Sequence, residues 1–313
     1  MTRPSSAVWK AEAVTIEQPS SGEPRRPHGP RDPGDAWVVA PGGERYWGRF
    51  GAAGLLAHDP ARGVLLQHRV SWSHFGGTWA LPGGARHEGE SAVDGALRES
   101  AEEAGVPADA VRPQLLSVFD LGYWSYATLV GRVVAPFEPV ISDPESVELS
   151  WVPVDEVEDY PLHPAFAASW QQLRPLLEVR PVLIVDVANV VGAVPDGWWR
   201  DRAGAASRLL ARLAAFADAG VGGDDLDLPE RTWYPELVAV VEGQAKTASA
   251  PAHVTVVPAP AAGDDEIVVQ VARAAASGSP VTVVTSDRGL AARVEEAGAT
   301  VRGARWLLDR LPG

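Results

Sequence analysis

A glycine turn followed by a glutamate-rich helix is the feature that most limits what this chain can fold into. The turn is Leu81-Pro82-Gly83-Gly84, and a helix is predicted from Ser91 to Ala104. Ser91 is a favourable N-cap, Asp94 three residues later completes a capping box, and Gly105 supplies the stop. Paired glycines let a backbone turn sharply and approach a ligand closely. The segment therefore predicts a tight loop with a helix directly behind it.

Three carboxylates share one face of this helix. Glu99, Glu102 and Glu103 stand at positions i, i+3 and i+4. Like charges at this spacing destabilise a helix by about 0.2–0.5 kcal/mol per pair, so a counter-charge is expected. Arg98 lies to the side of this face and is better placed to orient Glu90 or Glu99. A hard divalent cation such as Mg²⁺, which prefers oxygen ligands, fits the gap.

The segment from Gly84 to Val106 resembles the Nudix box at every charged and glycine position. Its one departure is Ser100, where a larger aliphatic residue is usual. The resemblance covers about residues 37–177 and implies an α/β/α sandwich with a mixed sheet. It also implies Mg²⁺- or Mn²⁺-dependent hydrolysis of the pyrophosphate linkage in a nucleoside diphosphate derivative or a nucleoside triphosphate.

The resemblance assigns roles to particular residues. The implied metal ligands are the Gly83 carbonyl, Glu99, Glu102 and Glu103. In the family, a further glutamate in a loop before a later strand often acts as a ligand or general base. Glu145 and Glu148 are the candidates, and we favour Glu145 because Glu148 is expected within the strand.

Substrate contacts are predicted at three positions of the same half. Arg98 is predicted both to orient the carboxylates and to contact the substrate. Trp79 and Tyr123 have rings that suit stacking on a base. For both rings, packing within the domain is the alternative, since the chain has 12 tryptophans.

A second acidic set follows the strands predicted in the C-terminal half. Val182–Val185 is a continuous apolar run, typical of a strand buried on both faces. Alternating strands and helices predict a parallel sheet, whose carboxyl ends share one edge. Asp186, Glu242 and Asp287 follow three such strands, and Asp265 opens a helix. We therefore expect Asp186, Glu242, Asp265 and Asp287 to form a second metal site, with helix capping as the alternative at Asp265.

This half resembles the PIN-like nuclease superfamily, and its NYN branch most closely. The resemblance rests on Asp186 with Asn189, on Gly263-Asp264-Asp265, and on Thr285-Ser286-Asp287-Arg288. It covers about residues 181–311 and implies Mg²⁺- or Mn²⁺-dependent RNA cleavage. Two alternatives stay open: a ribonuclease with the first domain as a nucleotide sensor, or a non-catalytic module that binds RNA or protein.

Aromatic and basic residues alternate just after the first of these strands. Trp198 and Trp199 precede Arg200 and Arg202. Rings and guanidinium groups in this arrangement suit stacking on bases and binding phosphate. Packing of the two tryptophans is the alternative.

Composition limits the remaining classes of function. The net charge is −14, which argues against coating nucleic acid or an anionic membrane, and the absence of cysteine excludes disulfides and thiolate sites. Residues 1–13 show no apolar signal segment, so we expect a cytoplasmic protein without a membrane partner. The predicted organisation is a disordered tail (1–36), in which Val8–Ile16 is a candidate edge strand, and two domains (37–177 and 178–313). The oligomeric state is left open.

Overall fold

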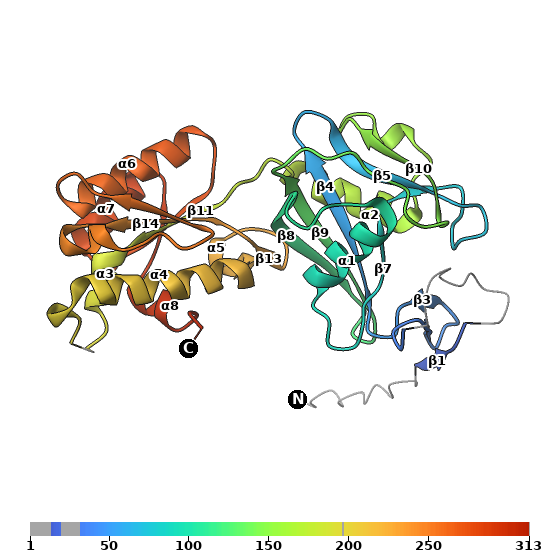
Figure 1. The fold of residues 1–313 in the computed structure, drawn as a ribbon, viewed down its shortest axis with the longest axis horizontal. Coiled ribbons are helices and arrows are strands. Elements are labelled where there is room, and N and C mark those ends of the chain that lie inside the picture. Colours follow the sequence, from blue (N-terminus) through green and yellow to red (C-terminus); the bar gives the residue numbers. More distant parts are fainter. Residues whose placement is uncertain (1–13, 20–31, 196, 313) are drawn as a thin grey trace, which may run out of the picture. The chain divides into compact units, whose positions relative to one another are not determined.

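The computed structural model describes residues 14–19, 32–195 and 197–312 (Figure 1). The chain divides into two compact units, Met1–Trp170 and Gln171–Gly313. The sequence prediction places the domain boundary after residue 177 instead. Within the described residues, no helix is both long and apolar enough to span a membrane.

A mixed sheet forms the core of the first unit. Its order is β10-β5-β4-β9-β8, with β4 and β9 parallel and the other neighbours antiparallel. The short strands β6 and β7 pair with β5 and β4. The strands are β4 (Ala52–Asp59), β5 (Gly63–Arg69), β6 (Trp79–Ala80), β7 (Gly83–Ala85), β8 (Val111–Asp120), β9 (Ser125–Val133) and β10 (Ser146–Val152). This confirms the α/β class, with the strands near their predicted positions.

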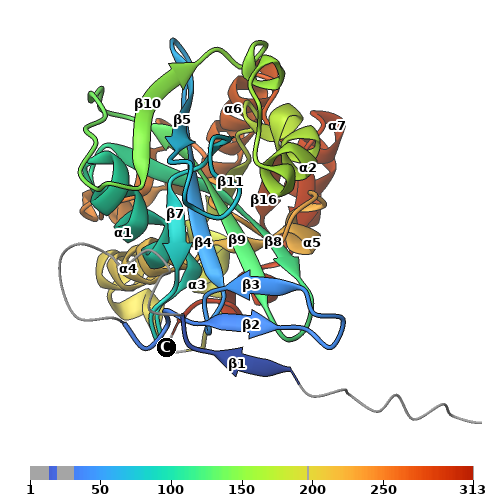
Figure 2. The ribbon, with the colours of Figure 1, turned by 90° about the vertical axis from the view of Figure 1, so that its right-hand side faces the viewer.

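A small antiparallel sheet precedes this core (Figure 2). It contains β1 (Thr15–Glu17), β2 (Trp37–Val39) and β3 (Arg45–Trp47). Part of the predicted disordered tail is ordered in the structure, because the backbone of Thr15–Glu17 pairs with β2. Residues 1–13 and 20–31, which hold the rest of that tail and most of the predicted edge strand, lie outside the described residues.

Helix α1 (Ala92–Ala104) packs on β4, β7 and β9 of the first unit. The Ser91 hydroxyl accepts a hydrogen bond from the Asp94 amide at 3.0 Å, and Gly105 ends the helix with φ +64°, so both predicted caps are confirmed. Ser100 is fully buried and its hydroxyl donates to the Leu97 carbonyl at 2.9 Å. A short η1 (Val157–Asp159) precedes α2 (Pro164–Leu173) and η2 (Arg174–Leu176).

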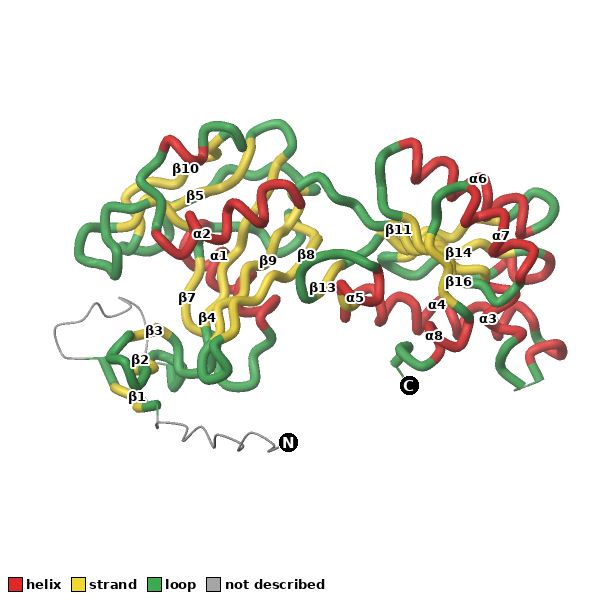
Figure 3. Tube along the Cα trace, turned by 180° about the vertical axis from the view of Figure 1, so that it is seen from behind, coloured by secondary structure: helices red, strands yellow, loops and turns green. Residues whose placement is uncertain are grey.

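The second unit contains a five-stranded, all-parallel sheet of order β15-β14-β11-β16-β17. These strands are β11 (Val182–Asp186), β14 (Glu236–Val241), β15 (Val254–Pro258), β16 (Val281–Val284) and β17 (Thr300–Arg302). Helices cover both faces of the sheet, α6 and α7 on one side and α3, α4 and α8 on the other (Figure 3). This confirms the predicted parallel sheet with crossover helices.

The helices and short elements of the second unit are as follows. The helices are α3 (Val187–Gly192), α4 (Arg202–Ala219), α5 (Gly223–Leu226), α6 (Gly263–Ala276), α7 (Arg288–Glu296) and α8 (Ala304–Leu308). The shorter pieces are η3 (Trp198–Arg200), η4 (Gly243–Thr247) and an antiparallel pair, β12 (Val221–Gly222) with β13 (Thr232–Trp233).

We expect a glutamate-specific protease to cut the native chain after Glu178. This side chain is 73% exposed, and it precedes the first buried strand of the second unit. Trypsin is a poor probe of the same segment, because Arg174 and Arg180 are each followed by proline. Mass spectrometry of the digest should show two stable fragments meeting at residue 178. Gradual degradation without such fragments would reject the predicted boundary.

Candidate active site

The glycine turn lies on β7 and brings the backbone against both β4 and α1. Gly83 pairs with Gly54, and a Cβ on Gly83 would stand 2.5 Å from the Gly54 Cα. A Cβ on Gly84 would stand 2.8 Å from the carboxylate of Glu99. At Gly83 the contact is with backbone and leaves no room for a side chain, whereas a side chain at Gly84 would displace the Glu99 carboxylate from the turn.

Two of the predicted carboxylates are buried beneath this turn. Glu99 is 1% exposed and Glu103 is 6% exposed. The Gly83 amide donates to Oε2 of Glu103 at 2.8 Å. Burial, together with the negative charges of Glu99 and Glu145, raises the pKa of Glu103 well above its usual range. The site therefore concentrates negative charge in a place where water screens it poorly.

Arg98 uses all five of its N–H donors, four toward carboxylates and one toward a backbone carbonyl. Nε and one Nη donate to the two oxygens of Glu90 at 2.8 and 2.9 Å. The same Nη donates to the Ala85 carbonyl, and the other Nη donates to Glu99 at 2.8 Å and Glu102 at 3.3 Å. This arrangement fits the predicted orienting role. It does not fit the predicted substrate contact, because no donor is left for a ligand.

Glu102 differs from the other two carboxylates of the helix face. Its side chain is 46% exposed and bonds to Arg98. Among the residues that the structure describes, no three His, Cys, Asp or Glu side chains converge closely enough to hold a metal ion. The helix thus places Glu102 beside the site with its carboxylate turned to Arg98.

The two downstream glutamates lie in different surroundings. Glu145 lies in the loop before β10, and its charge acts on the buried Glu103. Glu148 lies within β10, opposite His68, and is exposed. The loop position is therefore the one whose charge reaches the carboxylates of α1.

Replacing Glu145 with glutamine is expected to lower kcat by about 10²–10⁴-fold, the range for a general base, and to change KM much less. The matched control is Glu148→Gln, which neutralises an exposed carboxylate only three residues away. Steady-state kinetics on both variants decide the assignment. A large loss in Glu148→Gln with normal turnover in Glu145→Gln would reverse it.

The two predicted aromatic contacts also differ. Trp79 is 7% exposed, stacks on His68 with ring centroids 4.9 Å apart, and meets the edge of Tyr160. Its environment matches the packing alternative. Tyr123 is 39% exposed beside Tyr46, so its ring is accessible to a ligand.

Two further residues next to the carboxylates had no signal in the sequence. Tyr126 is half-buried, and desolvation together with the charges of Glu103 and Glu99 raises its pKa to about 12. Arg69, the last residue of β5, acts electrostatically on Glu103. Both belong to strands whose pattern predicts only burial and pairing.

Comparison with known proteins decides the family. The NUDIX domain family model matches residues 48–173. The chain is 49% identical over 154 residues to the protein named "Putative 8-oxo-dGTP diphosphatase 3" of Mycobacterium tuberculosis, which covers 46% of this chain and 70% of the relative. The chain belongs to the Nudix family. It is therefore a Nudix hydrolase, which acts on phosphoanhydride bonds.

Two other similar proteins carry the Nudix name. A "Nucleoside triphosphate pyrophosphatase/Nudix hydrolase fusion protein" of Bifidobacterium longum is 40% identical over 157 residues, covering 47% of this chain and 32% of the relative. The crystal structure of a Nudix hydrolase from M. smegmatis, RenU, is 47% identical with a TM-score of 0.42, covering 46% of this chain and 94% of that one. The Nudix family model leaves the parallel-sheet unit outside its match.

The residues of this Nudix site fit the divalent metal that such enzymes typically need. The donor set is made only of oxygens, which hard divalent cations prefer. Glu99 and Glu103 are both buried, and the negative charge of Glu99 helps to raise the pKa of Glu103. A cation here would relieve that repulsion.

The second predicted site lies where the parallel strands of the C-terminal unit end. Asp186 is 8% exposed and accepts hydrogen bonds from the Asn189 amide at 3.0 Å and the Thr285 hydroxyl at 2.9 Å. Burial and the charges of Asp264 and Glu242 raise its pKa. Asn189, the only asparagine of the chain, accepts from the Ser286 amide at 2.8 Å and so ties two strand ends together.

The other acidic residues at this edge have different hydrogen-bond and ion-pair partners. Glu242 accepts from the Gly263 amide at 2.9 Å, and Asp287 caps α7 by accepting from Leu290 at 2.9 Å. Asp265 pairs with Arg293 at 2.7 Å. Asp264 is half-buried whereas Asp265 is exposed. Burial and the charges of Asp287 and Glu242 raise the pKa of Asp264.

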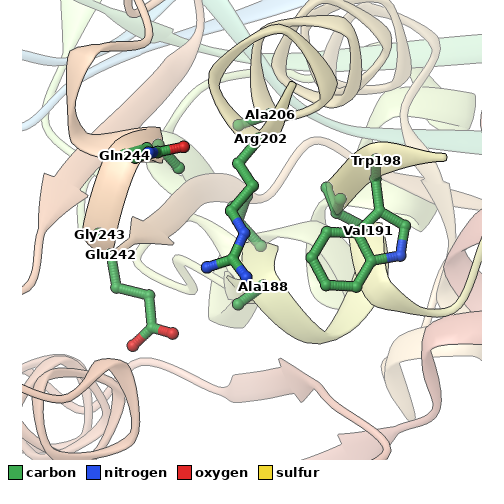
Figure 4. Close-up of a pocket in the computed structure, with 10 residues that line it drawn as sticks. Ala188, Val191, Trp198, Arg202, Ala206, Glu242, Gly243 and Gln244 are labelled. Atoms are coloured by element: carbon green, nitrogen blue, oxygen red, sulfur yellow. The ribbon is translucent and has the colours of Figure 1, made fainter. Parts of the chain in front are cut away.

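A pocket of about 160 Å³ opens next to this edge (Figure 4). Val187, Ala188 and Val191 of α3 line it, and Glu242, Gly243 and Gln244 form another side. The Arg202 guanidinium projects into it, 5.5 Å from the ring centre of Trp198. Trp199 is 57% exposed and outside the lining. Of the predicted aromatic and basic cluster, Trp198 and Arg202 line the pocket and the other members do not.

Proposed function

We propose that the Nudix unit hydrolyses a nucleoside triphosphate to a monophosphate and pyrophosphate, with 8-oxo-dGTP as the first candidate substrate. The 49% identity to the M. tuberculosis diphosphatase supports this choice. The observation that carries the reaction class is the pair of buried carboxylates, Glu99 and Glu103, packed against a glycine turn. Nucleoside diphosphate derivatives are the alternative substrates.

The proposed roles follow from the contacts. Glu99, Glu102, Glu103 and the Gly83 carbonyl hold Mg²⁺ or Mn²⁺, which when bound neutralises charge on the phosphate oxygens and activates water. Arg98 orients Glu90, Glu99 and Glu102 through four hydrogen bonds. Glu145 accepts the proton of the attacking water from its loop beside Glu103. Tyr123 is the exposed ring available to the base.

A panel of nucleotides tests the substrate class. The full chain is incubated with Mg²⁺ and 8-oxo-dGTP, dGTP, ADP-ribose or diadenosine tetraphosphate, and products are separated by ion-exchange chromatography. Pyrophosphate release that is fastest from 8-oxo-dGTP supports the proposal. Faster cleavage of ADP-ribose or diadenosine tetraphosphate would assign the alternative class.

For the C-terminal unit we propose a second divalent-cation site at Asp186, Glu242 and Asp264, with RNA as the partner. The charges of Glu242 and Asp264 raise the pKa of the buried Asp186 carboxylate, so a cation bound there would relieve the repulsion. The neighbouring Trp198 and Arg202 offer a ring for stacking and a charge for phosphate. The predicted members Asp265 and Asp287 are occupied by Arg293 and the start of α7.

Mn²⁺ titration of the melting temperature tests this second site in the Glu103→Gln background, where the first site is disabled. A ligand that binds only the folded state at 100 times its Kd stabilises by about 2.7 kcal/mol. Asp186→Asn and Asp264→Asn should abolish the remaining stabilisation, whereas Asp265→Asn should keep it. Cleavage of a labelled single-stranded RNA then separates a nuclease from a binding module. A melting temperature indifferent to Mn²⁺ would leave no metal site in this unit.

A further inference from the structure

A tight turn before α4 brings Trp198 and Arg202 to the same pocket of the C-terminal unit. The Asp201 amide donates to the Trp198 carbonyl at 3.2 Å, and the Asp201 carboxylate accepts from the Gly204 amide at 2.8 Å. These two hydrogen bonds fix the end of η3 against the start of α4. The Arg202 guanidinium consequently lies 5.5 Å from the centre of the Trp198 ring.

The remaining sides of this pocket differ in chemistry. Glu242 and Gln244 lie across the pocket from Trp198, and the Arg202 guanidinium lies between these two sides (Figure 4). The Glu242 carboxylate is held in place by the Gly263 amide at 2.9 Å. The apolar side consists of three residues of α3, which are Val187, Ala188 and Val191. The pocket therefore combines an aromatic ring, an apolar surface, a positive charge and an amide that can both donate and accept.

The hydrogen-bond donors of Arg202 are unused. Among residues 14–19, 32–195 and 197–312, its guanidinium faces the Trp198 ring and forms neither a hydrogen bond nor an ion pair. Three other arginines of the same unit pair with carboxylates at 2.6–2.9 Å: Arg293 with Asp265, Arg302 with Asp227 and Arg310 with Asp225. Arg202 instead projects into the pocket, where its planar fork of donors is open to an anionic ligand.

The size of the pocket fits a single ring system. Its volume is about 160 Å³. A cavity of about 150 Å³ in another protein holds one benzene ring, so this space suits one base rather than a stack of bases. One phosphate beside that base needs one positive charge, which agrees with a chain whose net charge is −14. A surface that follows a long nucleic-acid backbone would need many more basic residues.

We infer that this pocket binds one nucleoside monophosphate, with the base against the Trp198 ring and the phosphate on Arg202. This inference rests on the proposed function of the C-terminal unit, and it names the nucleotide unit that the RNA partner would present. Bases of any identity stack on aromatic rings, and a guanidinium matches two phosphate oxygens. In the metal-free protein the negative charge of Glu242 directs the phosphate to Arg202. Gln244 can hydrogen-bond the edge of the base.

The competing explanation is that Trp198 and Arg202 only pack the turn before α4. Under that explanation, Arg202→Gln and Trp198→Leu would lower the melting temperature and leave nucleotide binding unchanged. If the pocket binds a nucleotide, Arg202→Gln weakens binding and keeps the melting temperature near that of wild type, because the Arg202 guanidinium has no hydrogen-bond partner to lose. Melting and binding therefore separate the two explanations.

The experiment measures binding of AMP, GMP, CMP and UMP to the full chain by calorimetry, in EDTA and up to millimolar concentration. The matched controls are Arg200→Gln and Trp199→Leu, since both side chains are exposed and lie outside the pocket lining. We expect binding at least about tenfold weaker in Arg202→Gln and Trp198→Leu, and unchanged in both controls. Binding to the Nudix unit would be equal in all four variants. No binding by wild type, or equal binding by Arg202→Gln and wild type, overturns the inference.

A nucleoside monophosphate can be a free nucleotide or the end of an RNA strand. A short single-stranded RNA with a 5′-phosphate and the same RNA with a 5′-hydroxyl distinguish these sources. Tighter binding of the phosphorylated RNA than of the monophosphates assigns the RNA end, and tighter binding of a monophosphate assigns the free nucleotide. Equal binding of the two RNAs, with no loss in Arg202→Gln, rejects the phosphate contact.

Because these measurements exclude divalent metal, they separate this inference from the proposed metal site. Monophosphate binding that is lost in Arg202→Gln supports the pocket even if Mn²⁺ does not stabilise the C-terminal unit. Stabilisation by Mn²⁺, together with normal monophosphate binding by Arg202→Gln, would keep the metal site and reject the nucleotide pocket.

Discussion

Glu103→Gln should abolish Mg²⁺-dependent hydrolysis while leaving the fold intact. Changes to residues that merely support metal ligands cost about 10–100-fold, so loss of a buried ligand should cost at least about a hundredfold in kcat/KM. The isosteric amide keeps an oxygen that can accept from the Gly83 amide, so the turn should stay in place. Kinetics at several Mg²⁺ concentrations measure the loss, which excess metal should not reverse.

The stability of the same variant supplies the control. In the metal-free protein Glu103 faces Glu99 and Glu145, and its pKa is raised by burial and by both of them. Removing one charge from this group should leave the metal-free melting temperature unchanged or raise it. Adding Mg²⁺ should stabilise the wild-type first unit and not the variant. A lower metal-free melting temperature would show that the variant lost activity through misfolding.

Arg98→Gln is expected to destabilise the first unit by about 3–5 kcal/mol, the cost of removing one partner from a buried ion pair. Glu99, which is 1% exposed, would lose its charged partner, and Glu90 would lose two hydrogen bonds. For a unit of this size we expect the melting temperature to fall by roughly 6–20 °C. Turnover should fall as well, because the carboxylates of α1 lose their orientation.

The pH dependence of stability tests whether the lost contact between Arg98 and Glu90 causes the destabilisation. Hydrogen bonds from Arg98 lower the pKa of Glu90 below its ordinary value of 4.5. This stabilisation is therefore present above the ordinary pKa and is lost as pH falls through the lowered, folded-state value. Wild type should lose stability over that acidic range, whereas Arg98→Gln should be flatter there. Arg132→Gln, an exposed control, should behave as wild type, and an equal acid response in Arg98→Gln would exclude Glu90 as the origin.

The ends of a helix can be predicted from the sequence when they depend on neighbouring residues only. The caps of α1 depend on Ser91, Asp94 and Gly105 alone, and all three are found as expected. Helix α3 was not predicted, because three of the six residues of Val187–Gly192 are valines, which have low helix propensity. The Asp186 side chain caps it and ends the strand, a contact that the apolar pattern does not reveal.

The candidate sites show the same limit. The spacing of Glu99 and Glu103 predicts a shared face, but it does not predict that Glu102 turns outward to Arg98. Asp264 and Asp265 are adjacent, so the direction of each side chain depends on the rotation of α6 about its axis. Arg293 also fixes Asp265 through an ion pair. Arg69 carries no sequence signal, because its electrostatic effect on Glu103 comes from the tertiary structure and not from a local pattern.

Pyrophosphate release from 8-oxo-dGTP by the full chain, with and without Mg²⁺, tests the central claim most directly. The account predicts rapid release with Mg²⁺, little without it, and at least about a hundredfold loss in Glu103→Gln. Release that does not depend on metal, or that continues in Glu103→Gln at the wild-type rate, would contradict the account.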